Sequence, residues 1–456
     1  MWKVLVALLV LGVGAAALWV NAGRAEGPAI EIGGPEAIGQ TGEVAVKVTA
    51  PGGELSGLSV KLVQAETATA LFELTPETTA GVTTVGDEVT VTVPAGKRAL
   101  PDLKAGEARV DVTAVRPVLF GMRQAAATAT RTIQVRLTPP QVAVLSQFHY
   151  VNHGGSEMVV YRVNPPDADS GVRVGAIEYR GFPAGGSDAG MRVAFFALLW
   201  DQDLNTPITV YARDSIGNEG SGSFDFRVFP KQFRKSTINL DDRFLARVVP
   251  PILQNSTELK VDDPTNFLAS YLAINRELRR MNNETITNLA LETAPEILWR
   301  GPFKQLINTA VEAGFADQRT YVYNGSDVDH QVHLGFDLAS TANAPVRAAN
   351  RGRVVHAGWL GIYGNCVIVD HGMGLQSLYA HLSSIGVKVG DLVERDAELG
   401  RSGSTGLAGG DHLHFTMLLA GNAITPIDWW SAQWVQDRIL RKLADAGAPP
   451  AEIGGR

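Results

Sequence analysis

Cysteine is nearly absent from this sequence, with Cys366 the single example among 456 residues. That scarcity excludes an internal disulfide framework and any zinc site built on cysteine ligands. In the stretch GNCVIVDHG the residue stands among strand formers, so we expect it to fill a buried strand position. The chain therefore has to achieve stability, and any metal chemistry, without thiols.

A concentrated positive charge is also missing. Charged residues make up 19% of the chain, the formal net charge is −7, and no block of lysine and arginine is present. Such a block is what neutralises the phosphates of a bound nucleic acid. We therefore expect no nucleic-acid partner.

Long apolar runs are absent too, apart from one near the start. From Val4 to Val20 the sequence has 17 uncharged residues, enough for a helix of about 25 Å. We expect residues 1–26 to be an uncleaved anchor in the inner membrane, with Lys3 in the cytoplasm and the bulk of the chain in the periplasm. The stretch GRAE also offers a cleavage site after Ala25, so a signal peptide followed by secretion is the alternative.

Alternating apolar and polar residues are plentiful after this segment. Stretches such as EVAVKVTA and EVTVTV are separated by Gly- and Pro-rich turns, which is typical of β-sandwiches. The phrase ARDSIGNEG resembles the final hairpin of bacterial immunoglobulin-like modules. We predict two immunoglobulin-like β-sandwiches, residues 27–138 and 139–230. They are expected to be spacers, or docking surfaces for envelope or divisome proteins.

The pattern becomes helical in residues 231–319. Asp263 is placed to cap a helix with Pro264 in its first turn, and Asn282 or Asn283 to cap a second one. The simplest interpretation is a packed subdomain; a lid or a dimerisation element is the alternative. We then expect a glycine-rich β-domain over residues 320–432 and a C-terminal helix and tail over 433–456. The predicted fold class is mainly β and multidomain.

Histidines are few but clustered, since seven of the nine lie between His330 and His414. In GDHLHF, a β-strand would place His412 and His414 on one face, about 6.6 Å apart. His333 and Asp337, four residues apart in HLGFDL, can converge on a strand or a turn. His333, Asp337 and His414 together would give three protein ligands and leave a fourth position for water. That is the arrangement of a catalytic zinc site rather than a structural one.

These residues, in this order, resemble the lysostaphin/LytM-type zinc metallopeptidases, which cut peptidoglycan peptides. The resemblance covers about residues 321–430 and rests on HLGFDLA, YGNCVIVDHGMGLQSLYAHLS and GDHLHF. It implies an antiparallel-β peptidase domain in which His333, Asp337 and His414 bind one zinc ion. It further implies that His412, and His381 in YAHL, are catalytic and flank the water and the developing oxyanion. The sequence departs from many relatives at Asp411 and Thr416, which are not ligands.

The remaining candidates have simpler interpretations. Tyr379 is expected to be a core aromatic, with assistance in the groove as its alternative. His371 is expected to support the site through backbone hydrogen bonds. The other histidines are expected to have no part in the chemistry; they are His149, His153, His330 and His356.

Three functional hypotheses follow. The leading one is a zinc metalloendopeptidase that hydrolyses peptidoglycan peptides in the cell envelope. The second is a non-catalytic envelope scaffold, or an activator of a cell-wall amidase. The third is a secreted protease that acts on glycine-rich proteins or peptides and shares the same site.

Overall fold

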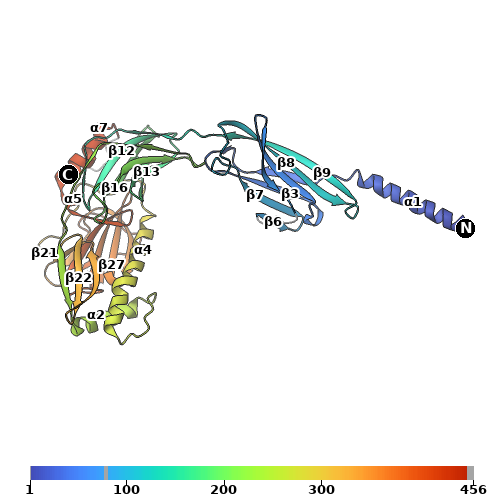
Figure 1. Ribbon diagram of the computed structural model, residues 1–456. Coiled ribbons are helices and arrows are strands. Elements are labelled where there is room, and N and C mark those ends of the chain that lie inside the picture. The colour runs from blue at the N-terminus through green and yellow to red at the C-terminus, as the bar shows by residue number, and fades with distance from the viewer. Residues whose placement is uncertain (1, 76–80, 449–456) are drawn as a thin grey trace. The chain divides into compact units, whose positions relative to one another are not determined.

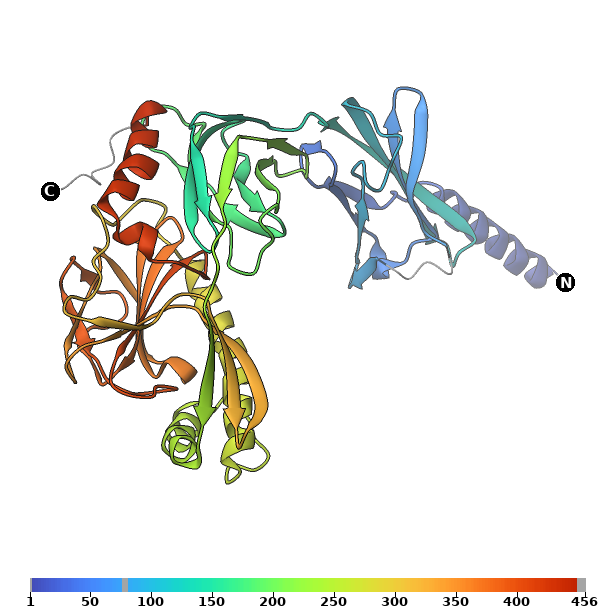
Figure 2. The same cartoon turned by 60° about the vertical axis from the view of Figure 1, so that its left-hand side comes forward.

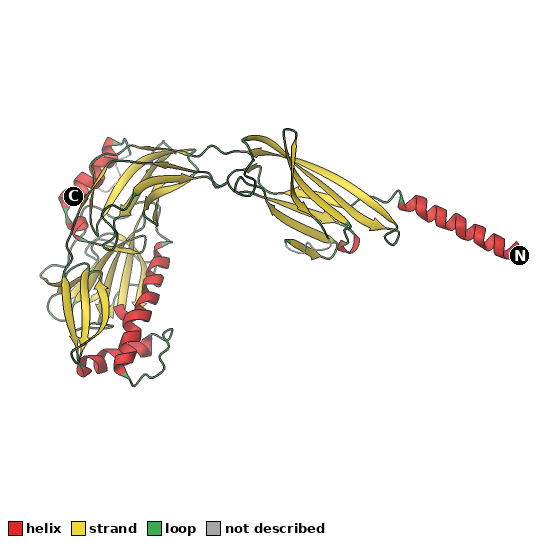
Figure 3. Ribbon diagram, in the orientation of Figure 1, coloured by secondary structure: helices red, strands yellow, loops and turns green. Residues whose placement is uncertain are grey.

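The apolar run forms helix α1 (Trp2–Ala22), none of whose residues is buried. The chain is described by a computed structural model that covers residues 2–75 and 81–448. Helix α1 is long and apolar enough to cross a membrane, and its side chains do not pack into the core of the protein. The fold is mainly β, with 43% strand and 19% helix (Figure 3). The expected tail falls largely at residues 449–456, outside the described range.

The chain divides into two compact units, residues 1–140 with 213–219, and residues 141–212 with 220–456. In the first unit, two sheets enclose one core, because apolar side chains alternate along their strands; β3, for example, is buried at every second position. One sheet has the order β1 (Ala29–Gly33), β3 (Glu43–Thr49), β7 (Glu88–Pro94), β6 (Val82–Val85). The other has the order β2 (Ala37–Ile38), β9 (Arg123–Val135), β8 (Gly106–Val118), β4 (Gly57–Gln64), β5 (Thr67–Glu73).

The second unit begins with another group of sheets. The first has the order β10 (Gln141–Val144), β12 (Ser156–Asn164), β16 (Met191–Ala197), β15 (Phe182–Pro183). The second has the order β14 (Ile177–Arg180), β13 (Asp169–Val174), β17 (Ile208–Arg213), β18 (Glu219–Gly222). A short parallel pair joins β11 (His149–Asn152) and β19 (Phe226–Phe229). These sheets form the second β-module, residues 141–229, of which all but residues 213–219 lie in the second unit.

The helical segment differs in detail from the sequence-based expectation. It contains β20 (Lys235–Leu240), α2 (Asp242–Asn255), α3 (Phe267–Ala273), a π-helical turn (Ile274–Leu278) and α4 (Arg279–Ala290). Asn266, not Asp263, caps α3, because Asp263 instead bonds Thr265 in the preceding turn. Neither Asn282 nor Asn283 is a cap, since both lie inside α4, and Asn282 Oδ1 accepts a hydrogen bond from the Ile362 N–H.

An eight-stranded sheet is the centre of the C-terminal part. Its order is β21 (Ala310–Ala313), β24 (Phe336–Ala339), β32 (Leu413–Leu419), β28 (Leu375–Leu382), β27 (Asn365–Gly372), β26 (Gly352–Trp359), β30 (Leu392–Val393), with β33 (Asn422–Ile424) beside β32. A small sheet joins β25 (Pro345–Arg347), β31 (Glu398–Arg401) and β29 (Ser384–Ile385). A third sheet joins β20 in parallel to β22 (Asp317–Tyr323), which pairs with β23 (Ser326–His333). The helical segment packs against this third sheet, as two views of the ribbon show (Figures 1 and 2).

The second β-module and the C-terminal domain share one hydrophobic core, although the sequence presents them as separate. Strand β12 is buried on both faces, and helix α7 (Arg441–Asp445) and the π-helical turn before it (Gln436–Leu440) pack against it. The Trp429 indole N–H donates to Ser156 Oγ at 3.0 Å. Lys442 Nζ lies 2.8 Å from Glu157 Oε1, and both side chains are almost completely buried. The two parts therefore form one folded unit.

Candidate metal centre

Three strands bring the candidate ligands together. His333 ends β23, a two-residue turn follows, and Asp337 lies in β24 directly opposite His414 of β32. Gly335 makes that turn possible, because a Cβ there would lie 2.6 Å from the His414 ring nitrogen Nε2. The approach of the two ligand-bearing strands thus depends on a position without a side chain.

The ligand atoms form a tight triangle. His333 Nε2 lies 2.8 Å from Asp337 Oδ1 and 3.0 Å from His414 Nδ1, and His414 Nδ1 lies 3.0 Å from the same carboxylate oxygen. All three side chains are buried. Within the described residues, the ligand atoms of these three side chains lie close enough together to hold a metal ion.

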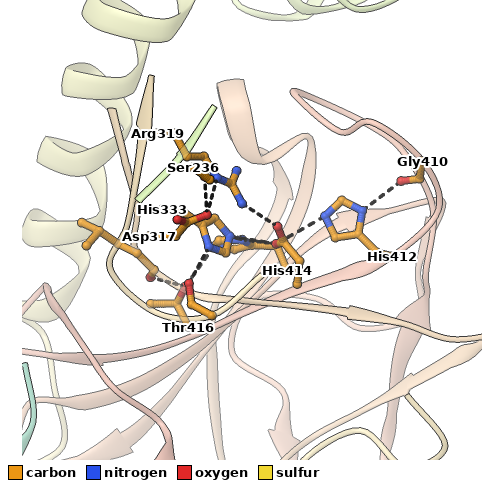
Figure 4. Close-up of polar contacts among 11 residues, drawn as sticks. Ser236, Asp317, Arg319, His333, Gly410, His412, His414 and Thr416 are labelled. Carbon is orange, nitrogen blue, oxygen red and sulfur yellow. Dashed lines mark hydrogen bonds and ion pairs between the residues drawn. The ribbon is translucent and has the colours of Figure 1, made fainter. Parts of the chain in front are cut away.

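Hydrogen bonds on the outer sides of the rings define which nitrogens carry hydrogen (Figure 4). His333 Nδ1–H donates to Gly314 O at 3.0 Å, which leaves Nε2 with a lone pair. Thr416 Oγ1 donates its hydrogen to Leu334 O and therefore accepts from His414 Nε2–H at 3.0 Å. Consequently His414 Nδ1 also presents a lone pair to the centre.

The donor set therefore fits a cation. Two imidazole lone pairs and a carboxylate oxygen within 3.0 Å of one another repel unless a positive charge lies between them. Two nitrogens and one oxygen form a borderline set that zinc accepts, and three protein ligands leave one tetrahedral position open.

The second oxygen of Asp337 is held from the neighbouring sheet. Arg319 Nη2 lies 3.1 Å from Asp337 Oδ2, and Arg319 Nε lies 3.4 Å from Asp317 Oδ2. Ser236 Oγ of β20 donates to Asp317 Oδ2 at 2.8 Å. The ion pair with Arg319 favours the ionised form of the Asp337 carboxyl. The carboxylate is therefore kept ionised and aimed at the centre.

His381 and His412 lie beside this centre. Their ring centroids are 4.9 Å apart, and the His381 ring lies 5.7 Å from that of His414. His381 Nδ1 bonds Thr405 O at 2.7 Å and His412 Nδ1 bonds Gly410 O at 2.9 Å, so each ring turns Nε2 towards the cavity. Burial lowers the pKa of His381, whereas the hydrogen bond and charge of Asp337 raise the pKa of His412 against the effect of burial.

The three candidate ligands and the two neighbouring histidines line one cavity of about 470 Å³; they are His333, Asp337, His414, His381 and His412. Apolar and aromatic side chains from the helical segment form part of its wall, among them Phe244 of α2 and Tyr271 of α3. Arg247 of α2 donates to Gly409 O at 2.8 Å, in the loop that leads to His412. The helical segment is therefore built into the cavity.

The other singled-out residues lie elsewhere. The Tyr379 hydroxyl accepts from the Ala349 N–H at 2.7 Å within the core. His371 is fully buried and bonds Arg351 O and Ser377 Oγ. Cys366 is fully buried, and burial raises the pKa of its thiol. The more distant histidines also lie away from the cavity lining; they are His149, His153, His330 and His356.

Sequence reasoning missed the residues that position the ligands. Arg319, Asp317 and Ser236 precede the histidine cluster and carry no spacing signal. Thr416 was visible only as a departure from the expected pattern.

Comparison with known proteins assigns this domain to a class. Residues 331–426 match peptidase family M23. A segment of 97 residues is 37% identical to the DD-carboxypeptidase/endopeptidase Mpg of Neisseria meningitidis, covering 21% of this chain and 22% of that protein. A segment of 114 residues is 32% identical to the peptidoglycan DD-endopeptidase ShyB of Vibrio cholerae, covering 25% and 26%. Lysostaphin of Staphylococcus staphylolyticus is 37% identical over 90 residues, or 19% of each chain.

Among solved structures, an M23 peptidase of Pseudomonas aeruginosa aligns over 61% of this chain and 94% of its own, with 20% identity and a TM-score of 0.39. The matched segment spans about a quarter or less of the curated relatives named above. The chain thus contains a peptidase domain, and that domain is an M23 domain of the LytM/lysostaphin type at residues 331–426.

Proposed function

We propose that the protein is a zinc-dependent endopeptidase that hydrolyses peptide bonds of peptidoglycan. The observation that carries the proposal is the convergence of two imidazole lone pairs and one carboxylate oxygen beside two further histidines. Relatives named as peptidoglycan endopeptidases support the substrate class. We further propose that α1 anchors the chain in the inner membrane, so that the catalytic unit works in the envelope.

The residues divide the chemistry between them. Zinc held by His333, Asp337 and His414 would supply Lewis acidity, polarising the scissile carbonyl and making water more acidic. His412 Nε2 accepts the proton of the attacking water while the new C–O bond forms, and returns it to the leaving amine as the C–N bond breaks. His381 Nε2, which also faces the cavity, is the further nitrogen that can hold a proton beside the developing oxyanion.

Metal analysis combined with muropeptide profiling tests the proposal. The wild-type chain should contain one zinc ion and should release new amino groups from peptidoglycan. His414→Ala should lose the metal, whereas His381→Ala should keep it and lose about 10²–10³ in rate. A wild-type chain with bound zinc that cuts no peptidoglycan, together with a His381→Ala cell of normal phenotype, would establish the scaffold or amidase-activator role instead. Cleavage confined to protein substrates would establish a protease of the third kind.

The helical segment has a proposed role as well. From the sequence, a lid that restrains access to the groove was an alternative to a packed subdomain. The parallel pairing of β20 with β22 and the Arg247–Gly409 hydrogen bond support a fixed wall that holds the cavity in shape. Removal of the segment should lower the activity if it is a wall and raise the activity if it is a lid.

A further inference from the structure

One arginine in the cavity has no acidic partner. Arg279, the first residue of α4, is half-buried and lines the cavity together with the five histidine and aspartate residues of the centre. Its Nε donates to Asn275 O at 3.0 Å and its Nη2 to Asn275 Oδ1 at 2.5 Å. Both acceptors are neutral. Within residues 2–75 and 81–448, Arg279 makes no ion pair.

A carboxylate linked to Arg279 through Asn275, that of Asp329, is already paired with another arginine. Asp329 Oδ1 pairs with Arg276 Nε at 2.8 Å, and Asp329 Oδ2 accepts from Asn275 Nδ2 at 2.9 Å. Asn275 thus separates Asp329 from Arg279 and turns its own carbonyl oxygen towards the guanidinium. The arrangement holds the Arg279 side chain in place without cancelling its charge.

Two phenols lie close to this cation. Tyr271 and Tyr363 both line the cavity, and the positive charge of Arg279 lowers the pKa of each, partly opposing the effect of burial. Neither hydroxyl makes a hydrogen bond to protein within the described part of the chain. The cavity's Glu312 acts elsewhere, since its charge bears on His412. One guanidinium and two free hydroxyls therefore share one part of the wall.

We infer that Arg279, with the hydroxyls of Tyr271 and Tyr363, forms a subsite for a carboxylate of the substrate. The inference rests on the proposed peptidase function and narrows its substrate to peptides that carry a free carboxylate near the scissile bond. A guanidinium gives a carboxylate charge-assisted hydrogen bonds of fixed geometry, and phenols add neutral donors. A neutral glycine bridge would leave this cation unused. The subsite favours acidic stem peptides.

A matched pair of substrates tests the subsite. Full-length protein is assayed on purified peptidoglycan stem-peptide dimers and on the same dimers with their carboxylates converted to amides. Arg279→Met should lower kcat/KM on the free-acid dimer about 10- to 100-fold, mainly through KM, since a charge-assisted hydrogen bond is lost. Its effect on the amidated dimer should be small, and Arg279→Lys should recover part of the loss. Arg280→Met, at the next position of α4, which is exposed and lies outside the cavity lining, is the matched control.

Equal losses on both substrates would overturn the subsite, as would a wild-type protein that prefers the amidated dimer. Equilibrium binding of the free-acid dimer to a His381→Ala background separates this failure from failure of the proposed activity. Weaker binding on adding Arg279→Met would retain the subsite, and a wild-type protein that cuts neither dimer would separately refute the peptidase. Unchanged binding would refute the subsite.

A second inference comes from the first unit. The turn between β8 and β9 exposes two large apolar side chains, Phe120 at 97% and Met122 at 63%. Leu119 and Phe120 adopt φ values of 53° and 55°, in the left-handed region that large side chains seldom occupy. An exposed phenylalanine on a strained turn points to an apolar partner.

The same turn is tied to the end of α1. Arg123 Nη1 donates to Trp19 O at 2.6 Å, and the guanidinium lies 4.9 Å from the Trp19 ring centroid. Arg116 Nη2, on the other arm of the hairpin, donates to Glu26 O at 2.8 Å. Tryptophan and arginine near the end of a spanning helix occupy the headgroup region of a bilayer. The apolar tip therefore lies next to the point where α1 would leave the membrane.

We propose that the β8–β9 tip inserts into the headgroup and acyl boundary of the bilayer that α1 spans. Insertion of the tip gives the first unit a second contact with the membrane, in addition to α1, and fixes the orientation of that unit relative to the bilayer. The inference requires α1 to be retained.

Fluorescence of the full-length protein in vesicles of phosphatidylethanolamine and phosphatidylglycerol tests this contact. A polarity-sensitive probe on Met122→Cys should emit at shorter wavelength than one on Glu66→Cys, in the exposed β4–β5 turn, and only the former should be quenched by lipid-attached nitroxides. The buried Cys366 leaves the background unlabelled. Adding Phe120→Asp should withdraw the Met122→Cys probe into water. Equal, water-like emission from both positions would refute the insertion.

Discussion

Thr416 determines which nitrogen of His414 faces the metal centre. Its hydroxyl hydrogen is committed to Leu334 O, so it can only accept from His414 Nε2–H. Thr416→Val removes that acceptor and leaves a buried N–H without a partner. We expect zinc affinity to fall about 10- to 100-fold, as for other residues that orient a ligand. Competition with a chromophoric chelator measures it, and Thr416→Ser, which keeps the hydroxyl, should bind like wild type. Wild-type affinity in the valine variant would contradict this role.

Asp428 is a buried carboxyl whose protonation affects stability. Its Oδ1 accepts from Asn152 Nδ2 at 2.9 Å, while its buried Oδ2 has no partner within the described residues. Burial raises the pKa of this carboxyl to about 6, against about 4 when unfolded. The folded state therefore holds the proton more tightly, and its contribution to stability is full below about pH 4 and lost as pH rises through about 6.

Asp428→Asn should remove this pH dependence. At pH 7 the variant should gain up to about 3 kcal/mol in the free energy of unfolding, since two pKa units correspond to that amount. At pH 4 it should match wild type. Urea titrations at both values measure the difference, with the exposed Asp445→Asn as control. A gain that is the same at both pH values would show that charge is not the cause.

Spacing along the chain paired His333 with Asp337 and His412 with His414, and the family resemblance selected His333, Asp337 and His414, which the structure brings together. Neither could predict Arg319, Asp317 or Ser236. Their contacts arise from the pairing of β20 with β22, between residues about eighty positions apart. A pair of strands joined across an inserted helical segment leaves no periodic trace in the sequence.

At the scale of elements, α7 is joined to β12 by a buried ion pair. Burial raises the pKa of Glu157 and lowers that of Lys442, and their mutual attraction opposes both shifts. Lys442→Met leaves Glu157 as an uncompensated buried charge. We expect a loss of about 3–5 kcal/mol in the free energy of unfolding.

Urea unfolding measures that loss, and the double variant with Glu157→Gln should recover much of it, since neither charge is then left alone. A double variant as unstable as the single one would show that packing, rather than charge, connects α7 with β12.

Strands and helices were predictable to different extents. Alternation along β3 and β7 predicted them directly, because one face of each is buried and the other exposed. Helix α2 was missed because Pro250 and Pro251 lie inside it, and proline normally ends a helix. The continuity of α4 past Asn282 depends on a long-range bond to Ile362 that no local pattern records.

At the scale of the whole molecule, a shortened chain beginning near Gly314 separates wall from lid. It lacks β20, α2 and the second β-module, and so exposes the core that Trp429 shares with Phe195. We expect lower activity and lower stability than in a chain that begins at Gln141. Cleavage rates and thermal unfolding of both chains measure this. A shorter chain that folds and cuts faster would establish the lid.

The sequence also could not show that the second β-module belongs to the same folded unit as the M23 domain. Its short strands separated by turns indicate a free-standing sandwich, but β12 is buried at six successive positions and β16 at five. Burial of both faces of a strand depends on elements far away in the sequence, such as α7, and therefore leaves no local signal.

The pairing of Glu157 with Lys442, and of Ser156 with Trp429, has a consequence for biosynthesis. Ser156 waits for a partner 273 positions later in the chain, so this folded unit stays unfinished until its C-terminal helices have been synthesised. For the proposed peptidase, activity would therefore arise late in synthesis.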